Sequence, residues 1–320
     1  MRVRQEVMRD QRVRHFLSLE DVSDSDLVSI VRRGLQFASE RSCLSEQPLS
    51  GTIVGIYFRT TSTRTRTAFS TGALRLGASI VSYGPHDLQE NTGEVAGDTA
   101  RVLAGMLDVL VVRTPRPTED LRILAAQRRM AVINGMSDTE HPTQALADLT
   151  TLTQHFGRID DLHVLYIGEG NSTAAALALS LARFPGTTLS LRTPPGYGLA
   201  DELLARARSM ARAGSRIHEE HHMTALPKQV DVVYTTRWQT TGTTKEDKDW
   251  VLTFTPFRVS DAVMSRYPAA IFMHDLPAHR GQEVTASVLD GPASIAFEQA
   301  HNKLYSAMAV LEWSAAGCAS

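Results

Sequence analysis

The stretch Phe58-Arg59-Thr60-Thr61-Ser62-Thr63-Arg64-Thr65-Arg66-Thr67 concentrates hydroxyls and guanidiniums at one point of the chain. An apolar run at 52–58 precedes it, typical of a buried parallel strand, and apolar residues at helical spacing follow it. A helix N-terminus offers unpaired N–H groups and partial positive charge. With Ser62 or Thr63 as N-cap, Thr65 and the guanidiniums of Arg64 and Arg66 would face an anion. The stretch predicts a phosphate site where a strand turns into a helix. The alternative, a basic surface turn, leaves so many hydroxyls and arginines unexplained.

Length and composition are those of a globular protein with two ordinary domains. The chain has 320 residues, of which 42% are hydrophobic and 21% charged. Its formal net charge of −2 argues against a general binder of nucleic acid or of anionic membranes. The basic cluster is therefore local, which indicates a small anion as ligand.

Cysteine usage and hydropathy favour a cytoplasmic protein. Cys43 and Cys318 are the two cysteines, too few for a disulfide framework, so we expect a reducing compartment. No run approaches the roughly 18 apolar residues of a membrane span. The start at residues 1–6 lacks the apolar core of a signal peptide.

Apolar strands alternate with helical patterns along the whole chain, which predicts parallel α/β sheets. The expected fold is two doubly wound parallel-sheet domains with a cleft between them. The loop at 157–161 is a candidate domain boundary. A polar segment at 237–249 is expected to be mobile. Expected strands are 52–58, 78–83, 109–112 (ending at Arg113), 131–134, 162–167, 188–191, 230–234 and 270–273; expected helices start at Asp24 and near Asp98 and cover 121–129, 145–156, 172–184, 200–213 and 293–315.

Polar clusters follow several of these strands, and ligands of open α/β sheets bind beyond the carboxyl ends of strands. The clusters are 59–67, Arg113, 141–144, 168–172, 235–239 and 274–280. Each is weak alone, and Arg113 alone reads more readily as a solvated strand end. Their shared position in both predicted domains indicates one cleft between the domains.

His141 precedes Pro142, a residue suited to a first helical turn, so His141 is expected near an N-cap. An imidazole at a positive helix end favours its neutral form and can donate to a carbonyl oxygen. A histidine that merely caps the helix is the equal alternative.

Two further motifs are weaker indications of a functional site. The turn at 168–173, Gly-Glu-Gly-Asn-Ser-Thr, lacks the third glycine of a dinucleotide fingerprint, and no acidic residue ends the next strand. The run at 218–222, His-Glu-Glu-His-His, resembles a metal site but is expected as a solvated loop away from the cleft. Asp275 is different, since it ends a strand on the cleft side. An acid there and a basic loop opposite suit a ligand with phosphate at one end and an amine at the other.

Together the motifs resemble the aspartate/ornithine carbamoyltransferase family over nearly the whole chain. The family's Ser-Thr-Arg-Thr-Arg loop matches 62–66, and its His-Pro-x-Gln element matches 141–144. Its Asp-Thr-Ala-Arg-Val-Leu run, followed by a strand-terminal arginine, matches 98–103 and Arg113. The ornithine branch's His-Cys-Leu-Pro-Ala-His-Arg-Gly element matches 274–281, with Asp275 in the cysteine position.

The resemblance implies attack of an amine on carbamoyl phosphate without a metal or organic cofactor. It implies a donor domain of residues 1–145 plus 293–320, an acceptor domain of residues 146–292, a final helix that returns to the first domain, and a homotrimer with shared active sites. It implies these roles: Ser62, Thr63, Arg64 and Thr65 hold the phosphate; Thr65, Arg113 and His141 polarise the carbamoyl oxygen; Gln144 and the Leu276 carbonyl orient the NH2; Gln89 reaches a neighbouring subunit's site; and Lys303 occupies the place of a common arginine.

The acceptor half matches neither branch of the family. Thr236 replaces an aspartate of the ornithine branch, and 240–242, Thr-Thr-Gly, replaces Ser-Met-Gly. Residues 236–239, Thr-Arg-Trp-Gln, match a Thr-Arg-x-Gln pattern of the aspartate branch instead. Ser172, beside Asn171, stands where the ornithine branch has a second asparagine. The acceptor site is expected to comprise Asn171, Ser172, Thr236, Arg237, Gln239, Thr240 and Asp275.

These departures predict an amine acceptor other than ornithine or aspartate, such as a shorter diamino acid or a specialised metabolite. Arg237 and Gln239 would hold an anionic or hydrogen-bonding group, and Asp275 would bind the ammonium and help to deprotonate it. Arg237 exposed on a mobile loop is the competing interpretation. Three alternatives stay open for the whole chain: an ordinary ornithine carbamoyltransferase, a catalytically silent binding or regulatory member, and a dinucleotide-dependent oxidoreductase.

Overall fold

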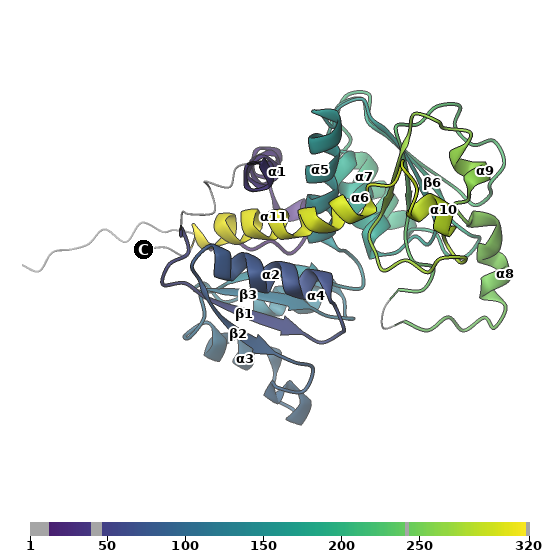
Figure 1. Ribbon diagram of the computed structural model, residues 1–320. Helices are drawn as coiled ribbons and strands as arrows, with labels where there is room; N and C mark the ends of the chain where they lie inside the picture. The colour runs from purple at the N-terminus through teal and green to yellow at the C-terminus, as the bar shows by residue number, and fades with distance from the viewer. Residues whose placement is uncertain (1–12, 40–46, 241–242, 318–320) are drawn as a thin grey trace, which may run out of the picture.

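The computed structural model describes residues 13–39, 47–240 and 243–317. Cys43, Cys318, Thr241 and Gly242 lie outside the described residues, as does the start of the chain. Two α/β lobes lie side by side and are joined by α5 (Pro142–Phe156) and α11 (Ala296–Ala315), as Figure 1 shows. Among the described residues, no helix is both long enough and apolar enough to cross a bilayer.

The first lobe is built on a four-stranded parallel sheet in the order β2-β1-β3-β4. Ile56 of β1 belongs to one buried apolar cluster and Tyr57 to another, so the two faces of the sheet are covered separately. Figure 1 shows α2 on one face and α3 on the other. The elements are α1 (Asp24–Ser39), β1 (Ile53–Phe58), α2 (Arg64–Arg75), β2 (Ser79–Tyr83), α3 (Ala96–Leu103), β3 (Val109–Arg113), α4 (Thr118–Leu124) and β4 (Ala131–Met136).

The second lobe holds a five-stranded parallel sheet in the order β7-β6-β5-β8-β9. The helix α6 that follows β5 is buried along its whole length, which explains its run of alanines. The elements are β5 (His163–Ile167), α6 (Ser172–Leu181), β6 (Thr188–Arg192), α7 (Asp201–Ser209), β7 (Arg216–Glu220), β8 (Val232–Thr235), α8 (Trp250–Phe254), α9 (Asp261–Met264), β9 (Ile271–His274) and α10 (Ala286–Leu289).

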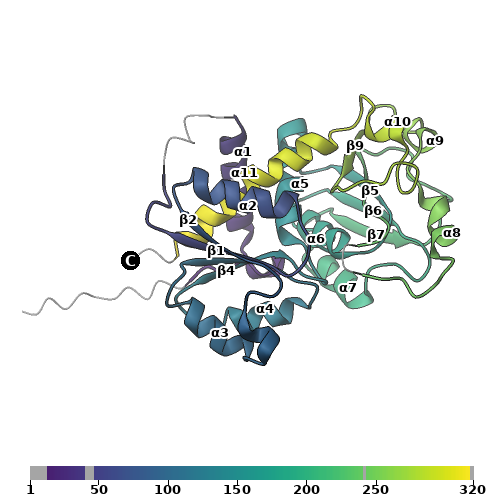
Figure 2. The same cartoon turned by 60° about the horizontal axis from the view of Figure 1, so that its bottom comes forward.

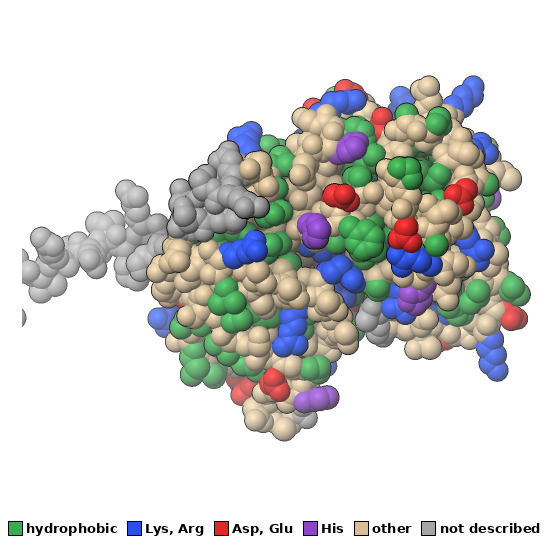
Figure 3. All heavy atoms as spheres, viewed as in Figure 1, with side chains coloured by type: hydrophobic (Ala, Val, Ile, Leu, Met, Phe, Trp, Pro, Cys, Tyr) green, Lys and Arg blue, Asp and Glu red, His purple; other side chains and the backbone are tan. Residues whose placement is uncertain are grey.

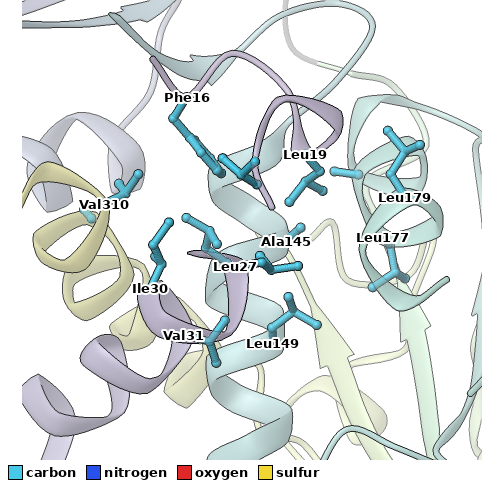
Figure 4. Packing of buried hydrophobic residues seen from close by; sticks show 14 of the residues in the cluster. Phe16, Leu19, Leu27, Ile30, Val31, Ala145, Leu149, Leu177, Leu179 and Val310 are labelled. Atoms are coloured by element: carbon cyan, nitrogen blue, oxygen red, sulfur yellow. The ribbon is translucent and has the colours of Figure 1, made fainter. Parts of the chain in front are cut away.

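The last helix returns to the first lobe, as expected. Figures 1 and 2 show α11 lying along α2 and passing α1 and α5. In Figure 4, Leu27, Ile30 and Val31 of α1 pack toward Leu149 of α5 and Val310 of α11. All are buried, so one apolar cluster ties both ends of the chain to the helix that joins the lobes.

The helix expected at 121–129 is shorter than predicted and ends at Leu124. The Gln127 side chain explains the difference. Its amide nitrogen donates to the carbonyls of Leu124 and Met130, and its oxygen accepts from the backbone N–H groups of Arg129 and Met130. These bonds replace helical ones and form a turn.

The prediction of a solvated loop at 218–222 was wrong, because residues 216–220 form the edge strand β7. Only Ile217 of this strand is buried, so the sequence shows little strand pattern. Glu220 pairs with Arg192 of the neighbouring strand at 2.8 Å. In the described part of the chain, no group of three or more His, Cys, Asp or Glu side chains is arranged to hold a metal ion. The short helices α8, α9 and α10 were also missed.

Candidate active site

A cleft of about 260 Å³ lies between the lobes, at the carboxyl ends of β1, β3, β5, β8 and β9. It gathers nearly all the side chains proposed from the sequence, from both lobes and from α11. Gln89 and Arg66 do not line it. The predicted residues that line it are Ser62, Thr63, Arg64, Thr65, Arg113, His141, Gln144, Asn171, Ser172, Thr236, Arg237, Gln239, Thr240, Asp275, Leu276 and Lys303.

The start of α2 forms one wall of the cleft. Thr63 is the N-cap residue, but contrary to expectation its side chain makes no capping hydrogen bond. Its backbone is helical at φ −73° and ψ −56°, which leaves the hydroxyl to face the cleft instead. Thr65 is buried, whereas Arg66 is exposed and does not line the cleft. The prediction that Arg66 faces the anion was therefore wrong, because its helical position directs it outward.

Arg64 and Arg113 bring two guanidiniums to this wall. Burial lowers the pKa of Arg64, and Asp275 partly opposes this. Burial also lowers the pKa of Arg113 to about 10, helped by the charge of Arg64 and opposed by that of Asp275. Arg113 donates from Nε to the Thr60 hydroxyl at 3.3 Å. Both groups remain cations near neutral pH. Two neighbouring guanidiniums therefore make this wall of the cleft positive, which favours an anionic ligand.

His141 is the N-cap of α5, with Pro142 in the first turn, as predicted. Its backbone N–H donates to the Ser172 carbonyl at 3.0 Å, which joins the lobes beside the cleft. Burial, followed by the charges of Lys303 and Arg113, lowers the pKa of His141 well below its usual value. The imidazole is therefore neutral and can donate a hydrogen bond without a charge.

Gln144 lies one turn further along α5 and is buried. Its Nε2 donates to Asp148 Oδ1 at 2.8 Å, while its Oε1 is buried with no hydrogen-bond partner among the described residues. Asp148 was missed from the sequence. The available signal was an acid placed four residues after Gln144, so that both side chains share one face of the helix.

Lys303 of α11 lines the cleft and is buried. Burial lowers its pKa to about 8, with Asp275 and Asp148 opposing the shift and Arg64 and Arg113 adding to it. It is a cation at neutral pH.

Asp275 supplies the carboxylate that was expected on the acceptor side. It accepts hydrogen bonds from the Thr173 hydroxyl at 2.8 Å and from the Thr236 hydroxyl at 3.0 Å. Burial alone would raise the pKa of Asp275, but the hydrogen bond and charge of His274 and the charge of Lys303 outweigh burial and lower it. The group is therefore an anion that faces the cationic wall.

The segment after β8 forms the outer rim of the acceptor side. Asn171 caps α6 through Oδ1 and donates from Nδ2 to the hydroxyls of Thr236 and Thr240. Gln239 donates to the Thr243 carbonyl at 2.8 Å, so its amide serves the loop. Arg237 differs, because its buried Nε has no hydrogen-bond partner in the part of the chain that the structure describes.

Lys245 anchors this rim in a way that the sequence did not reveal. Its ammonium pairs with Glu169 and lies 4.6 Å from the ring centre of Tyr197 and 4.8 Å from that of Phe254. Trp250 adds a third ring at 5.5 Å. An ion pair among three aromatic rings holds the segment down.

Gln89 lies on an exposed short 3-10 turn, Gln89–Thr92, and accepts a hydrogen bond from the Thr92 hydroxyl at 2.6 Å. The neighbouring Glu90 pairs with Arg59, at the end of β1. The loop is thus tied to the phosphate-loop strand but points away from the cleft of its own chain.

Comparison with known proteins gives two matching family models. Residues 14–154 match the aspartate/ornithine carbamoyltransferase carbamoyl-P binding domain, and residues 160–314 match the Asp/Orn binding domain of the same family. The ornithine carbamoyltransferase of Bacillus subtilis is 36% identical over 300 residues, covering 93% of this chain and 92% of that protein. The enzyme of the same name from Halorhodospira halophila is 37% identical over 303 residues, covering 94% and 98%.

Solved structures agree with this assignment. The ornithine carbamoyltransferase of Pyrococcus furiosus superimposes with a TM-score of 0.88 at 33% identity, over 94% of this chain and 96% of that one. A cationic wall, a neutral histidine and a carboxylate therefore lie in one cleft of a known scaffold. The chain belongs to the aspartate/ornithine carbamoyltransferase family and is a carbamoyltransferase.

Proposed function

We propose that the chain transfers the carbamoyl group of carbamoyl phosphate to the side-chain amine of ornithine, releasing phosphate and forming citrulline. The observation that carries the proposal is Asp275, a part-buried carboxylate that faces the cationic wall of the same cleft. Curated relatives at about 35% identity bear the name ornithine carbamoyltransferase. They favour this acceptor over the atypical one expected from the sequence.

The donor half is assigned to residues 1–145 plus 293–320. The phosphate lies at the N-terminus of α2, against the hydroxyls of Ser62, Thr63 and Thr65 and the guanidinium of Arg64. Arg113 and His141 donate to the carbamoyl oxygen. Donors placed before the reaction stabilise the oxyanion of the tetrahedral intermediate, and this preorganisation supplies much of the catalysis.

The acceptor half is assigned to residues 146–292. Asp275 is ionised and binds the ammonium of the incoming amine, next to Thr236 and Thr173. The ammonium gives one proton to solvent, the lone pair of the neutral amine forms the C–N bond, and the C–O bond to phosphate breaks. The leaving phosphate takes up a proton from the substituted nitrogen.

The exchange between Thr236 and Asp275 supports an ordinary acceptor. The ornithine branch carries an aspartate at the position of Thr236 and a cysteine at that of Asp275. Here the carboxylate comes from 275, and the two side chains are hydrogen-bonded at 3.0 Å. The negative charge therefore stays at nearly the same place in the cleft, although the residue that carries it has changed.

A second candidate acceptor is an amine with an additional anionic group, such as a shorter diamino acid. The specific observation in its favour is Arg237, which lines the cleft and whose buried Nε has no hydrogen-bond partner among the described residues. A guanidinium there can bind a carboxylate.

Exposed apolar side chains support the homotrimer. Leu74 of α2, Val102 of α3 and Met106 are 56%, 53% and 66% exposed. Figure 3 shows green side chains over the lobe that carries these helices. The exposed loop with Gln89 lies on the same lobe. A homotrimer in which this lobe contacts a neighbouring subunit would place Gln89 at that subunit's cleft.

A panel of amines tests the acceptor. Phosphate release from carbamoyl phosphate is measured with ornithine, aspartate, putrescine and the diamino acids with one or two side-chain carbons. Ornithine is expected to give the highest kcat/KM. Faster turnover of a shorter diamino acid would replace it by the second candidate, and no turnover with any amine would contradict the proposal as a whole.

A further inference from the structure

The Gln144 amide can turn either its oxygen or its nitrogen toward the cleft. The choice decides whether it can accept a hydrogen bond from the NH2 of the donor. With Oε1 toward the cleft it accepts from the carbamoyl NH2; with Nε2 toward the cleft, two donors would oppose each other. The structure shows Nε2 turned away, donating to Asp148 Oδ1 at 2.8 Å. Oε1 is the buried atom that lacks a partner among the described residues.

Asp148 is fully buried and belongs to a network that spans both lobes. Its Oδ1 also accepts from Gln299 Nε2 of α11 at 2.7 Å, and its Oδ2 accepts from the Tyr234 hydroxyl of β8 at 3.2 Å. Gln299 Oε1 in turn accepts from the His274 backbone N–H at 2.9 Å, next to Asp275.

This arrangement keeps Oδ1 an acceptor whatever the charge of Asp148. Two amide N–H groups already point at Oδ1, so a proton taken up by the carboxylate resides on Oδ2, against the Tyr234 oxygen. In both protonation states the group opposite Gln144 accepts a hydrogen bond. An apolar residue at this position would leave the Gln144 amide free to turn over.

We propose that Asp148 is a positioning residue for carbamoyl transfer, which fixes the Gln144 amide with its oxygen toward the carbamoyl nitrogen of the donor. The inference rests on the proposed function and on the role that the family resemblance implies for Gln144, which is to orient the carbamoyl NH2. Asp148 itself touches no reacting atom. Its contribution is the orientation of one amide, and Gln299 of the last helix holds the same Oδ1 through a second hydrogen bond.

A matched pair of ligands isolates this contact. Carbamoyl phosphate carries an NH2 where acetyl phosphate carries a methyl group, and the two share their phosphate and carbonyl. Affinities are measured by calorimetry without an amine. The wild type is expected to bind carbamoyl phosphate about tenfold more tightly, the effect of one buried hydrogen bond. Absence of this preference in the wild type would refute the assumed role of Gln144 and, with it, the inference.

Variants of the buried acid decide the inference itself. Asp148→Leu is expected to lose the tenfold preference while binding acetyl phosphate within about twofold of the wild type. Asp148→Asn imitates the protonated acid, with Oδ1 accepting and Nδ2 donating to Tyr234, and is expected to keep the preference. Tyr234→Phe removes a neighbouring hydrogen bond from the same network and is the control, with its preference unchanged.

Retention of the preference in Asp148→Leu would overturn the inference, as would an equal loss of affinity for both ligands. If Asp148→Leu does not fold, Asp148→Ala supplies a second test. It also removes the acceptor opposite Gln144 Nε2, so the preference for carbamoyl phosphate is expected to fall. Retention of the preference in this variant would also overturn the inference.

Discussion

Removing the charge of Asp275 should separate the two halves of the cleft. In Asp275→Asn the shape is nearly unchanged, but the amide offers no anion to the incoming ammonium. The carboxylate is 14% exposed and accepts hydrogen bonds at 2.8 Å from Thr173 and at 3.0 Å from Thr236. A charge-assisted hydrogen bond contributes about 1.5–3 kcal/mol, which corresponds to a loss of roughly 10–150-fold in kcat/KM for the acceptor.

The donor should be affected much less, because two effects oppose each other. Loss of an anion strengthens the attraction of the cleft for a dianion. The same loss lowers the pKa of Lys303 below about 8, since Asp275 now raises it, and weakens that attraction. We expect the dissociation constant of carbamoyl phosphate, measured by calorimetry, to change by less than about fivefold.

Steady-state kinetics with varied ornithine and saturating carbamoyl phosphate tests the acceptor side. Asp138→Asn is the matched control, because Asp138 is an exposed carboxylate in a neighbouring pocket and should matter by about twofold or less. An acceptor kcat/KM within twofold of the wild type in Asp275→Asn would refute the reasoning. So would a loss of donor affinity as large as the loss for the acceptor.

The exchange of the two acceptor residues gives a stricter form of the same test. Asp275→Thr should be as impaired as Asp275→Asn, and adding Thr236→Asp should return a carboxylate to the same region. Recovery of at least about tenfold in acceptor kcat/KM is expected. If the double variant is no better than Asp275→Thr, the position of the carboxylate matters as much as its charge, and the exchange argument for ornithine fails.

Three further predictions concern other parts of the molecule. Arg64→Ala should lower kcat/KM for carbamoyl phosphate by about 10²–10³, because the leaving phosphate loses a bidentate partner, and single-turnover kinetics checks this. Arg237→Ala should raise KM for the acceptor by about tenfold with an unchanged donor affinity in calorimetry; an effect on the donor alone would contradict the division of the cleft. Burial raises the pKa of Glu140 to about 7, above its unfolded value near 4.5, so the native state binds its proton more tightly and stability falls as pH rises between these values. In urea unfolding, Glu140→Gln should remove about 3 kcal/mol of that decline; part of it persists because Asp148 is shifted in the same direction.

The wall of the cleft that the first lobe forms could be predicted almost completely from the sequence. Its residues follow buried parallel strands, and the carboxyl ends of such strands meet at one edge of a sheet. Ser62, Arg113 and His141 are all positioned by short-range pattern: a strand end, a turn or a helix start. Arg66 failed because the sequence does not say which side of a first helical turn faces the cleft.

The supporting contacts could not be predicted, because they depend on packing between distant segments. Asp148 and Gln299 are 151 residues apart, yet their side chains are 2.7 Å from each other. Lys245 pairs with Glu169 among three aromatic rings from two other segments. Neither contact has a sequence spacing that a local pattern could reveal. The prediction of the site was therefore limited by side-chain contacts between segments far apart in the sequence, and not by the prediction of helices and strands.

Arg237 belongs to the sequence pattern that predicted an acceptor other than ornithine. Its position in the cleft is nevertheless compatible with ornithine. An α-amino acid acceptor brings a carboxylate as well as its amines. A guanidinium such as that of Arg237, whose Nε has no hydrogen-bond partner among the described residues, can bind that carboxylate. Arg237 and Asp275 then fix the two ends of the acceptor, and the separation between them selects the number of side-chain carbons. Under this reading, Arg237→Ala flattens the dependence of kcat/KM on the chain length of the diamino acid, whereas Asp275→Asn lowers the whole series together. If Arg237→Ala keeps the wild-type optimum of diamino-acid chain length, the carboxylate of the acceptor does not bind at Arg237, and this argument fails.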